Sequence, residues 1–445
     1  MSLVSAAVTG ILGEYDHEFE IAPADDFVIL YGPNGVGKTK FLEIIDAATR
    51  LRLFTLVRQP FETAALCYSD GTVLHVTQKS AAQEDEHAPP RAAQPLRMRL
   101  TFPDSPSISW EYAGDEFEEG LRLDSPWRQI SDDLWEDSTD GEVLPLESLK
   151  ERYGRRYGQP AKPPQEIQDF LESVPSFLIE TQRLRIEQNQ PQGRAWGRTS
   201  IKGRKQHRSR IAEQAASIRT LVNGAQTDHS RITQQLDRTF PNRVLEANLD
   251  ELELDPAMIR ERYNDQNFFR SRLGRVASVA LEDALSLPER DLEIWELKLL
   301  NLYLDDADKK LAPFEGLLQK IELLEQIVNS RLLKKEMHVT DGDGLLVRHS
   351  ASGRSIDLDS LSSGEQHEVI LMIDLLFNVP AGGVVLIDEP EISLHVAWQI
   401  AFIPDVRRIA ALAGFRFVVA THSPQIINDS WDKAIRLGPP EEPFQ

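Results

Sequence analysis

A glycine-rich loop between an apolar run and an amphipathic stretch constrains the fold of this chain more than any other feature. Phe27–Tyr31 is a short apolar run, typical of a strand that is buried on both faces. Residues 32–39 follow it and match the pattern G-x-x-x-x-G-K-T, and the residues after them have the apolar spacing of a helix. This order of strand, loop and helix predicts an α/β fold with a phosphate-binding loop.

The loop also predicts a nucleotide ligand. Glycines permit unusual backbone angles, so successive N–H groups can point at phosphate oxygens. Lys38 would neutralise charge on the β- and γ-phosphates, and Thr39 would offer its hydroxyl to Mg²⁺. An accidental glycine-rich turn is the alternative, and the flanking strand and helix argue against it. The predicted nucleotide-binding residues of this loop are Asn34, Gly35, Val36, Gly37, Lys38, Thr39 and Lys40.

A second apolar run ends in two carboxylates. Val384–Ile387 is followed by Asp388 and Glu389, and a parallel sheet would deliver both to the edge where its ligands bind. Asp388 would hold Mg²⁺, directly or through water. Glu389 would polarise the water that attacks the γ-phosphorus. A strand that ends in a solvated acidic turn is the alternative, and the nearby phosphate-binding loop disfavours it.

Two further segments narrow the class of site. Leu361–Gln366, with the sequence LSSGEQ, precedes an apolar helical stretch and places small polar residues at a helix N-terminus, where anions bind. An ordinary serine N-cap would give the same pattern. Thr421–Pro424 follows the last apolar run and places His422 at another strand end.

Length and composition exclude several classes of protein. The chain has 445 residues, a formal net charge of −22 and one cysteine, Cys67, which predicts two or three structural units in a reducing compartment, the cytoplasm. The N-terminus lacks a basic region, so we expect no signal peptide. No apolar run is long enough to span a bilayer. These features exclude a disulfide-stabilised secreted scaffold, a membrane span and a uniformly basic nucleic-acid coat.

In the rest of the chain, the spacing of apolar residues predicts a region of strands and a region of helices. Short alternating runs and the turn Asp70-Gly71 predict an antiparallel β layer over about residues 60–115. Leu317, Ile321, Leu324 and Val328 share one helix face within a mostly helical region, 206–335, and the stripe is too short for a long coiled-coil arm.

Residues 111–142 carry twelve acidic and two basic residues, whereas 183–210 carry nine basic residues and one acidic residue. A solvated surface or a docking face would account for either segment. The expected division is an N-terminal ATPase lobe over 1–185, a helical insertion over 186–335 and a C-terminal ATPase lobe over 336–445.

The motifs, in this order along the chain, resemble those of the soluble ATP-binding-cassette (ABC) branch of P-loop ATPases, which includes Rad50, RecF, SMC and OLD-like proteins. The resemblance implies a P-loop NTPase of the ABC type, a mixed sheet with an antiparallel β layer and a helical insertion, and ATP and Mg²⁺ as ligands. It also implies that the P-loop of one copy and the signature serine of another close on one ATP. In this pattern the signature residues that contact nucleotide are Ser362, Ser363, Gly364 and Glu365, the catalytic residues are Glu389, Gln182 and His422, and the metal ligands are Thr39, Gln182 and Asp388.

The stretches DEPEISLHVAWQ and ATHSPQII are similar to the AAA-family ATPases of bacterial anti-phage defence, above all the ATPase subunit of PARIS systems and next the Septu ATPase. This resemblance implies a homo-oligomeric sensor or scaffold that controls a nuclease of the Toprim or HNH type, with a phage protein or nucleic acid as trigger and no membrane partner. Because the sequence ends soon after His422, we expect no Toprim domain in the chain itself.

Other functions remain open on the sequence alone. A RecF- or Rad50-like ATPase that binds DNA in repair or maintenance would use the basic stretch 183–210. The cassette of a membrane importer is disfavoured by the acidic charge and the helical insertion, and a ring translocase by the LSSGEQ motif.

Overall fold

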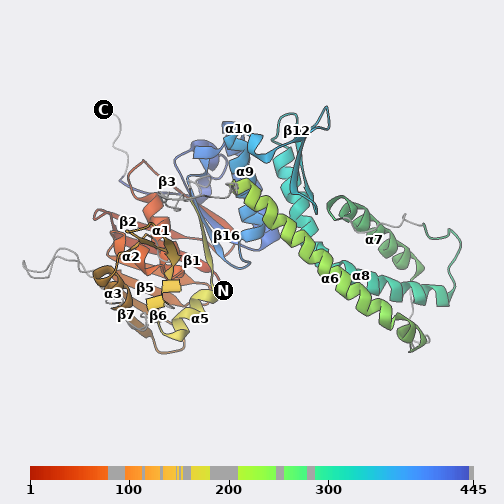
Figure 1. Cartoon of the computed structure of the whole chain (residues 1–445), viewed down its shortest axis with the longest axis horizontal. Helices are drawn as coiled ribbons and strands as arrows, with labels where there is room; N and C mark the ends of the chain where they lie inside the picture. The colour runs from red at the N-terminus through yellow and green to blue at the C-terminus, as the bar shows by residue number, and fades with distance from the viewer. Residues whose placement is uncertain are drawn as a thin grey trace, which may run out of the picture. The chain divides into compact units, whose positions relative to one another are not determined.

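The chain folds into two compact units, one made of Met1–Lys205 with Asn378–Gln445 and the other of Gln206–Phe377. Figure 1 labels their helices and strands. The computed structural model describes residues 1–78, 96–112, 116–130, 134–146, 148–149, 152–153, 162–180, 209–246, 255–277 and 286–439.

A five-stranded parallel sheet forms the centre of the first unit. Its order is β11, β15, β16, β3 and β17 (Ser176–Ile179, Val384–Asp388, Arg416–Thr421, Phe27–Tyr31 and Ala434–Arg436). β15 is buried at every residue and β3 at all but its last, so neither strand shows polar alternation in the sequence. The strands predicted from these two apolar runs are confirmed.

Helix α1 (Lys38–Thr49) connects this sheet to a second one. It contacts β11, β15 and β16 of the parallel sheet and also β1 (Leu3–Ile11) and β4 (Thr63–Tyr68) of the antiparallel sheet. Apolar side chains from both sheets and from α1 form one continuous core. The other described helical segments of this unit are α2 (Leu53–Arg58), α3 (Glu116–Asp124), α5 (Gln165–Ser173), η4 (Pro390–Ser393), α10 (Val396–Ala413), α11 (Pro424–Ile427) and η5 (Trp431–Lys433).

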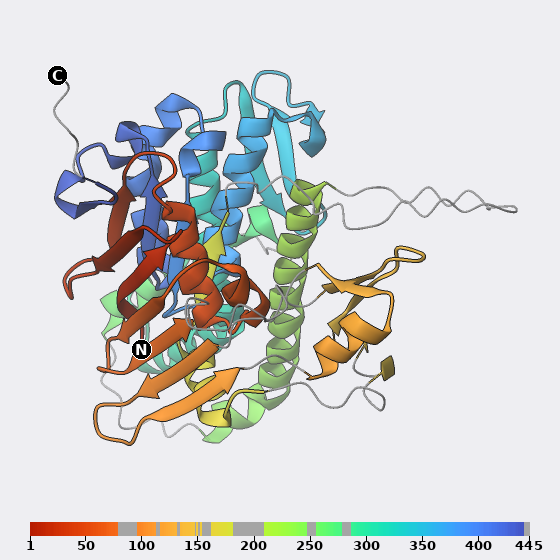
Figure 2. The same ribbon diagram turned by 90° about the vertical axis from the view of Figure 1, so that its left-hand side faces the viewer.

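The second sheet of this unit has six antiparallel strands. Their order is β2, β1, β4, β5, β6 and β7 (Tyr15–Glu20, Leu3–Ile11, Thr63–Tyr68, Val73–Gln78, Leu96–Thr101 and Ile108–Tyr112). Figure 2 shows the orange strands of this sheet side by side. The predicted antiparallel layer and the hairpin turn at Asp70-Gly71 are confirmed, whereas the two N-terminal strands were not predicted.

Part of the acidic segment 111–142 folds around a small core of its own. Strands β8, β9 and β10 (Trp127–Gln129, Leu134–Asp137 and Val143–Pro145) form an antiparallel sheet. Phe117 and Leu121 of α3 pack with Trp127, Trp135 and Leu149. The described part of this segment therefore contributes to an apolar centre despite its acidic composition.

Three long helices pack together in the described part of the second unit. α6 (Arg210–Glu246) packs along α8 (Ile294–Asn329), and α7 (Pro256–Val276) packs on α8. The predicted helical region is confirmed. Its two long helices, α6 and α8, extend well beyond the short apolar stripe, and ion pairs such as Arg243–Asp306 connect their polar parts. In the stripe itself, Leu317 is only half-buried and Leu318 is buried. No helix among the described residues is long and apolar enough to cross a bilayer.

The residues after α8 belong to the same unit as the helices. Strands β12, β13 and β14 (Lys335–Thr340, Gly344–His349 and Ser355–Ile356) form an antiparallel sheet, followed by the turn η2 (Leu358–Ser360), helix α9 (Ser363–Ile373) and the π-helical turn η3 (Asp374–Asn378). The sheet and α9 contact α6 and α8, and Arg331 forms a buried ion pair with Glu368. The division of the chain therefore differs from the expected one, which grouped 336–377 with the C-terminal lobe.

Candidate functional site

The glycine-rich loop leaves β3 and enters α1 at the carboxyl edge of the parallel sheet. Gly35 and Gly37 both have φ +87°, in the left-handed region that side chains disfavour. A Cβ on Gly32 would lie 2.4 Å from the carbonyl oxygen of Leu437, and one on Gly37 would lie 2.7 Å from Cγ2 of Ile11. The backbone path therefore requires glycine, and a loop of this form presents successive N–H groups to an anion.

The N-terminus of α1 adds further N–H donors. The helix begins at Lys38 after Gly37, none of the described side chains caps it, and its first turn holds no acidic residue. The first N–H groups of a helix have no intrahelical acceptor and carry a partial positive charge. A phosphate can therefore bind at this end of α1. Lys40 turns aside from the loop, since its ammonium is 2.7 Å from Oε2 of Glu43.

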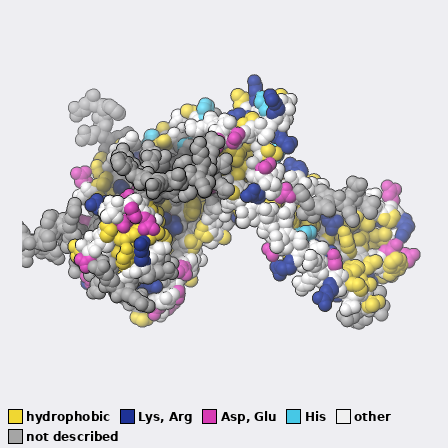
Figure 3. Space-filling model, in the orientation of Figure 1, with side chains coloured by type: hydrophobic (Ala, Val, Ile, Leu, Met, Phe, Trp, Pro, Cys, Tyr) yellow, Lys and Arg dark blue, Asp and Glu magenta, His cyan; other side chains and the backbone are white. Residues whose placement is uncertain are grey.

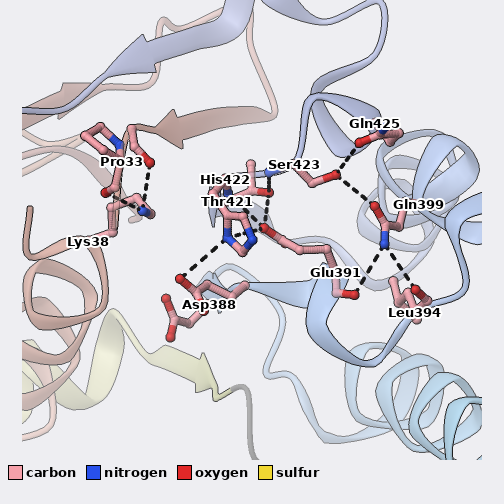
Figure 4. A network of polar contacts seen from close by, with 12 residues as sticks. Pro33, Lys38, Asp388, Glu391, Leu394, Gln399, Thr421, His422, Ser423 and Gln425 are labelled. Carbon is pink, nitrogen blue, oxygen red and sulfur yellow. Dashed lines mark hydrogen bonds and ion pairs between the residues drawn. The ribbon is translucent and has the colours of Figure 1, made fainter. Parts of the chain in front are cut away.

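Lys38 is buried and folds back over the loop. Its Nζ donates hydrogen bonds to the carbonyl oxygens of Gly32 and Pro33, each at 3.0 Å (Figure 4). An ammonium in this position lies beside the N–H groups of the loop. It can transfer its hydrogen bonds from the two carbonyls to phosphate oxygens.

Thr39 and Asp388 meet although they are far apart in the sequence. The Thr39 hydroxyl lies 3.1 Å from Oδ1 and 3.0 Å from Oδ2 of Asp388, at the end of β15. A hydroxyl beside one carboxylate is the donor set with which proteins hold Mg²⁺ when phosphates and waters complete its coordination. These two residues therefore fit the predicted magnesium ion.

Glu389 has a strained backbone. Its φ is +41° and its ψ is +57°, and its N–H donates to the carbonyl oxygen of Ala420 at 2.8 Å. A non-glycine residue in this conformation costs about 1–3 kcal/mol and is found mostly at functional sites. Its side chain stays 21% exposed, which leaves the carboxylate accessible to water.

His422 follows β16 and lies between two carboxylates. Its Nδ1 is 3.0 Å from Oε1 of Glu391 and 3.8 Å from Oε1 of Glu389. Figure 4 shows His422 pointing toward Glu391, which comes from η4. Sequence reasoning did not predict this contact of Glu391 with His422, although the DEPE motif contains a carboxylate two residues after Glu389.

The signature motif LSSGEQ lies in the second unit. Ser362 is the N-cap of α9 and forms a capping box with Glu365, whose Oε2 accepts from the Ser362 hydroxyl at 2.9 Å. Lys335 places its ammonium 2.8 Å from the same carboxylate. Burial acts to raise the pKa of Glu365, but hydrogen bonds from Lys335 and Ser362 outweigh it and hold this pKa below its usual value. Glu365 thus points at the cap and at Lys335.

The structure brings the predicted residues of the first unit to one sheet edge. They come from the loop, from the end of β15 and from the end of β16. Ser362, Ser363, Gly364 and Glu365 lie together at the start of α9 in the other unit. Gln182 lies outside the described residues, and the strand before it, β11, pairs with β15 so that Ile179 faces Ile387.

The solved structures to which this chain is similar include two SMC head domains. The first is the Smc head domain with an extended coiled coil from Pyrococcus furiosus, bound to the C-terminal domain of ScpA, at 12% identity and TM-score 0.38 over 96% of this chain and 91% of that chain. The second, from Thermotoga maritima, has 11% identity and TM-score 0.32 over 98% and 92%. Both TM-scores are below 0.5, too low for either similarity to bear on the function of this chain.

Comparison with protein families gives a stronger result. The model of a family described as "AAA domain, putative AbiEii toxin, Type IV TA system" matches residues 27–428, which span every motif discussed above. With the parallel sheet, the glycine-rich loop and the antiparallel layer, this match confirms the predicted fold class as far as an α/β P-loop NTPase with an antiparallel β layer. The chain therefore belongs to this AAA-domain family of putative AbiEii toxins.

Proposed function

We propose that this chain binds and hydrolyses ATP and acts as an ATP-dependent switch. One observation carries the proposal: the hydroxyl of Thr39 meets the carboxylate of Asp388 beside the buried ammonium of Lys38. A hydroxyl, a carboxylate and an ammonium at the start of a helix match the phosphates and metal ion of a nucleotide. Membership of an AAA-domain family supports the same assignment.

Each residue has a distinct part in the proposed reaction. Lys38 would neutralise the phosphates, and Thr39 and Asp388 would hold Mg²⁺, which would supply further positive charge to the phosphates. Glu389 polarises the attacking water, and His422 contacts the γ-phosphate through Nε2. Gln182 remains a predicted ligand of the metal and the water.

The signature serine acts on a neighbouring copy in this proposal. Ser362 is the N-cap of α9 and forms a capping box with Glu365. The other N–H groups of the first turn can bind an anion. The resemblance to ABC ATPases implies that Ser362, Ser363 and Gly364 of one copy close on the ATP held by another. ATP would then assemble a homo-oligomer, and hydrolysis would reopen it.

Two substitutions test this cycle. Lys38→Ala should abolish MgATP binding in calorimetry, because the loop loses its only buried ammonium among the described residues. Glu389→Gln should retain binding and lower the hydrolysis rate at least 100-fold, so that sedimentation detects a persistent ATP-bound oligomer. Rapid hydrolysis by the Glu389→Gln variant would remove Glu389 from its role, and a monomer at saturating MgATP would refute the shared site.

We propose that the ATPase controls a partner nuclease of the Toprim or HNH type in anti-phage defence. A phage protein or a nucleic acid would act as the trigger. The family description, which names a toxin–antitoxin system, supports defence. Figure 3 shows hydrophobic side chains gathered over the end of the second unit that α7 and α8 form. Trp295, Leu299 and Tyr303, spaced four residues apart on α8, are exposed apolar side chains of this unit. Exposed apolar patches mark interaction sites, which supports a protein partner.

The partner proposal has a direct test. A nuclease encoded beside this chain should co-purify with it, and Trp295→Ser should weaken this association while MgATP hydrolysis stays unchanged. Lys298→Ser, on the same stretch of α8, serves as the matched control. Co-purification that is insensitive to Trp295→Ser would refute this docking face.

Direct DNA binding is a second candidate, favoured by one basic cluster. His75, Thr77, Arg97 and Arg99 line a hollow of about 350 Å³ on the open face of the antiparallel sheet. Arg97 is paired with Glu111 at 3.2 Å, whereas Arg99 is 3.3 Å from the uncharged hydroxyl of Ser109. The predicted basic stretch 183–210 lies almost wholly outside the described residues.

Salt dependence separates the two functions. If Arg99 contacts a DNA phosphate, Arg99→Gln should lower the salt slope of binding by about 0.9. Affinity that does not change with salt, or the absence of DNA binding, would leave only the switch.

A further inference from the structure

A buried carboxylate lies two residues after Glu389 and has no part in the proposed reaction. Glu391 belongs to η4, and its side chain is only 5% exposed. Taking a carboxylate out of water costs several kcal/mol unless hydrogen bonds or an opposite charge compensate it. The contacts of Glu391 therefore indicate what it does.

Its side-chain contacts among the described residues lie at the end of β16, with Thr421 and His422. Oε1 accepts from the Thr421 hydroxyl at 2.6 Å and from the backbone N–H of His422 at 2.8 Å. The same oxygen is 3.0 Å from Nδ1 of the His422 ring (Figure 4). Among the described residues, Oε2 has no hydrogen-bond partner. The imidazole is thus the ionisable group that this buried carboxylate contacts.

We propose that Glu391 is the positioning residue of His422. A carboxylate can only accept, so a hydrogen bond across the 3.0 Å between Nδ1 of His422 and Oε1 of Glu391 requires the hydrogen to be on Nδ1. The other ring nitrogen, Nε2, is then the one that can face a phosphate. This assignment of the tautomer stands on geometry alone, whereas its consequence for the rate rests on the proposed ATPase function.

Glu391 also keeps His422 apart from Glu389. The Glu389 carboxylate is 3.8 Å from the same Nδ1, too far for a hydrogen bond but near enough to compete for the ring. Without Glu391, the ring could move to Glu389 and occupy the carboxylate that has to polarise water. Holding Nδ1 therefore orients the histidine and leaves Glu389 available.

A glutamine fixes the turn that carries Glu391. Gln399 of α10 donates from Nε2 to the backbone oxygens of Glu391 at 3.3 Å and of Leu394 at 3.1 Å. Its Oε1 accepts from the Ser423 hydroxyl at 2.8 Å. Gln399 thus connects the turn to the residue after His422, so both sides of the Glu391–His422 contact are held in place.

Two variants of Glu391 separate its charge from its hydrogen bond. Glu391→Gln keeps an accepting oxygen without the charge, and Glu391→Leu removes both. Loss of a residue that orients a catalytic group typically costs about 10–100-fold. We expect kcat for MgATP hydrolysis to fall about 10-fold in Glu391→Gln and about 100-fold in Glu391→Leu, with KM within about twofold of the wild type because the loop contacts are unchanged.

Asp46→Asn provides the matched control. Asp46 is another buried carboxylate of the same unit, and it accepts from the Ser176 hydroxyl at 3.0 Å near the far end of α1. Its replacement should lower the melting temperature without changing kcat. An equal loss of kcat in Asp46→Asn would mean that Glu391 acts only through stability, which would overturn the proposal, as would an unchanged kcat in Glu391→Leu.

Nuclear magnetic resonance of ¹⁵N-labelled histidine tests the tautomer without any variant of Glu391. The chain has ten histidines, and His422→Asn identifies the signal of His422. We expect the wild-type spectrum to place a hydrogen on Nδ1. A neutral ring with hydrogen only on Nε2 would overturn the proposal. A wild-type chain that hydrolyses no MgATP would refute the proposed function, and this spectrum would still decide the role of Glu391.

Discussion

Alanine at Gly37 should destabilise the chain more than alanine at Gly35, although both glycines have φ +87°. A Cβ at Gly35 meets nothing within 4 Å, whereas one at Gly37 would lie 2.7 Å from Cγ2 of Ile11. The Ile11 side chain is fully buried in the core beneath the antiparallel sheet. It therefore has little room to move away, and the two substitutions differ chiefly in this contact.

The expected sizes follow from the geometry. The left-handed backbone costs alanine about 1–2 kcal/mol, and the lower entropy of the unfolded chain returns about 0.4–1 kcal/mol. Gly35→Ala should therefore lower the free energy of unfolding by about 0.5–1 kcal/mol. Overpacking in a close-packed core adds about 1–3 kcal/mol, so Gly37→Ala should lower the free energy of unfolding by about 1.5–4 kcal/mol.

Urea denaturation without nucleotide measures both losses on one scale. Ile11→Ala removes the methyl group that Gly37→Ala would contact, so the excess cost of Gly37→Ala should shrink in that background. A double-mutant cycle with Gly37→Ala, Ile11→Ala and both together should give a coupling energy above about 1 kcal/mol. Equal losses for Gly35→Ala and Gly37→Ala, or no coupling to Ile11, would refute the steric reasoning.

Two further predictions concern the second unit. Glu368→Ala should lower the free energy of unfolding by about 3–5 kcal/mol, because it leaves the guanidinium of Arg331 buried without its carboxylate; a urea midpoint equal to that of the wild type would contradict this. The hydrogen bonds from Lys335 and Ser362 hold the pKa of Glu365 below its usual value. They therefore stabilise the folded chain fully at pH values above the usual glutamate pKa of about 4.3. This stabilisation is lost as the pH falls through the lower pKa that Glu365 has in the folded chain. Glu365→Gln should therefore be less stable than the wild type at neutral pH, with a difference that closes in acid, and a constant difference across the acid titration would exclude the effect.

The buried strands were predictable because their sequence signal is local. β3 and β15 are apolar at nearly every residue, and turn-forming residues bound them. β1 escaped prediction for a physical reason: its register shifts between Leu3 and Ser5 against β4 and between Val8 and Ile11 against β2. Such irregularities break the alternation of buried and exposed residues on which strand prediction depends.

The division into units was less predictable because it depends on contacts between distant residues. Strand-like and helical segments after α8 carry no mark that assigns them to the helices before them. The contacts of the β12–β14 sheet and α9 with α6 and α8, and the Arg331–Glu368 pair, make that assignment in three dimensions. Motif order along the chain therefore predicted the class of fold correctly but misplaced the boundary at 335.

The same distinction holds within the candidate site. Sequence motifs with local chemistry made four candidate site residues predictable: Lys38, Thr39, Asp388 and His422. The role of Glu391 was hidden, since its partners are Thr421 and His422, 30 and 31 residues further along the chain. A sequence pattern states that DEPE contains three carboxylates, but it does not state the direction in which each one points.

The backbone of the DEPE turn explains how neighbouring carboxylates take opposite directions. Glu389 adopts a left-handed conformation that costs about 1–3 kcal/mol, so the surrounding structure has to hold it. The N–H of Glu389 donates a hydrogen bond to the carbonyl oxygen of Ala420, and the Glu391 carboxylate accepts hydrogen bonds from Thr421 and the N–H of His422. Residues at the end of β16 therefore hold the turn on both sides of Pro390. The side chain of Glu389 is 21% exposed, whereas that of Glu391 is only 5% exposed. Because both constraints come from the end of β16, the positions of Glu389 and His422 depend on one another, and a change that loosens Glu391 should disturb both.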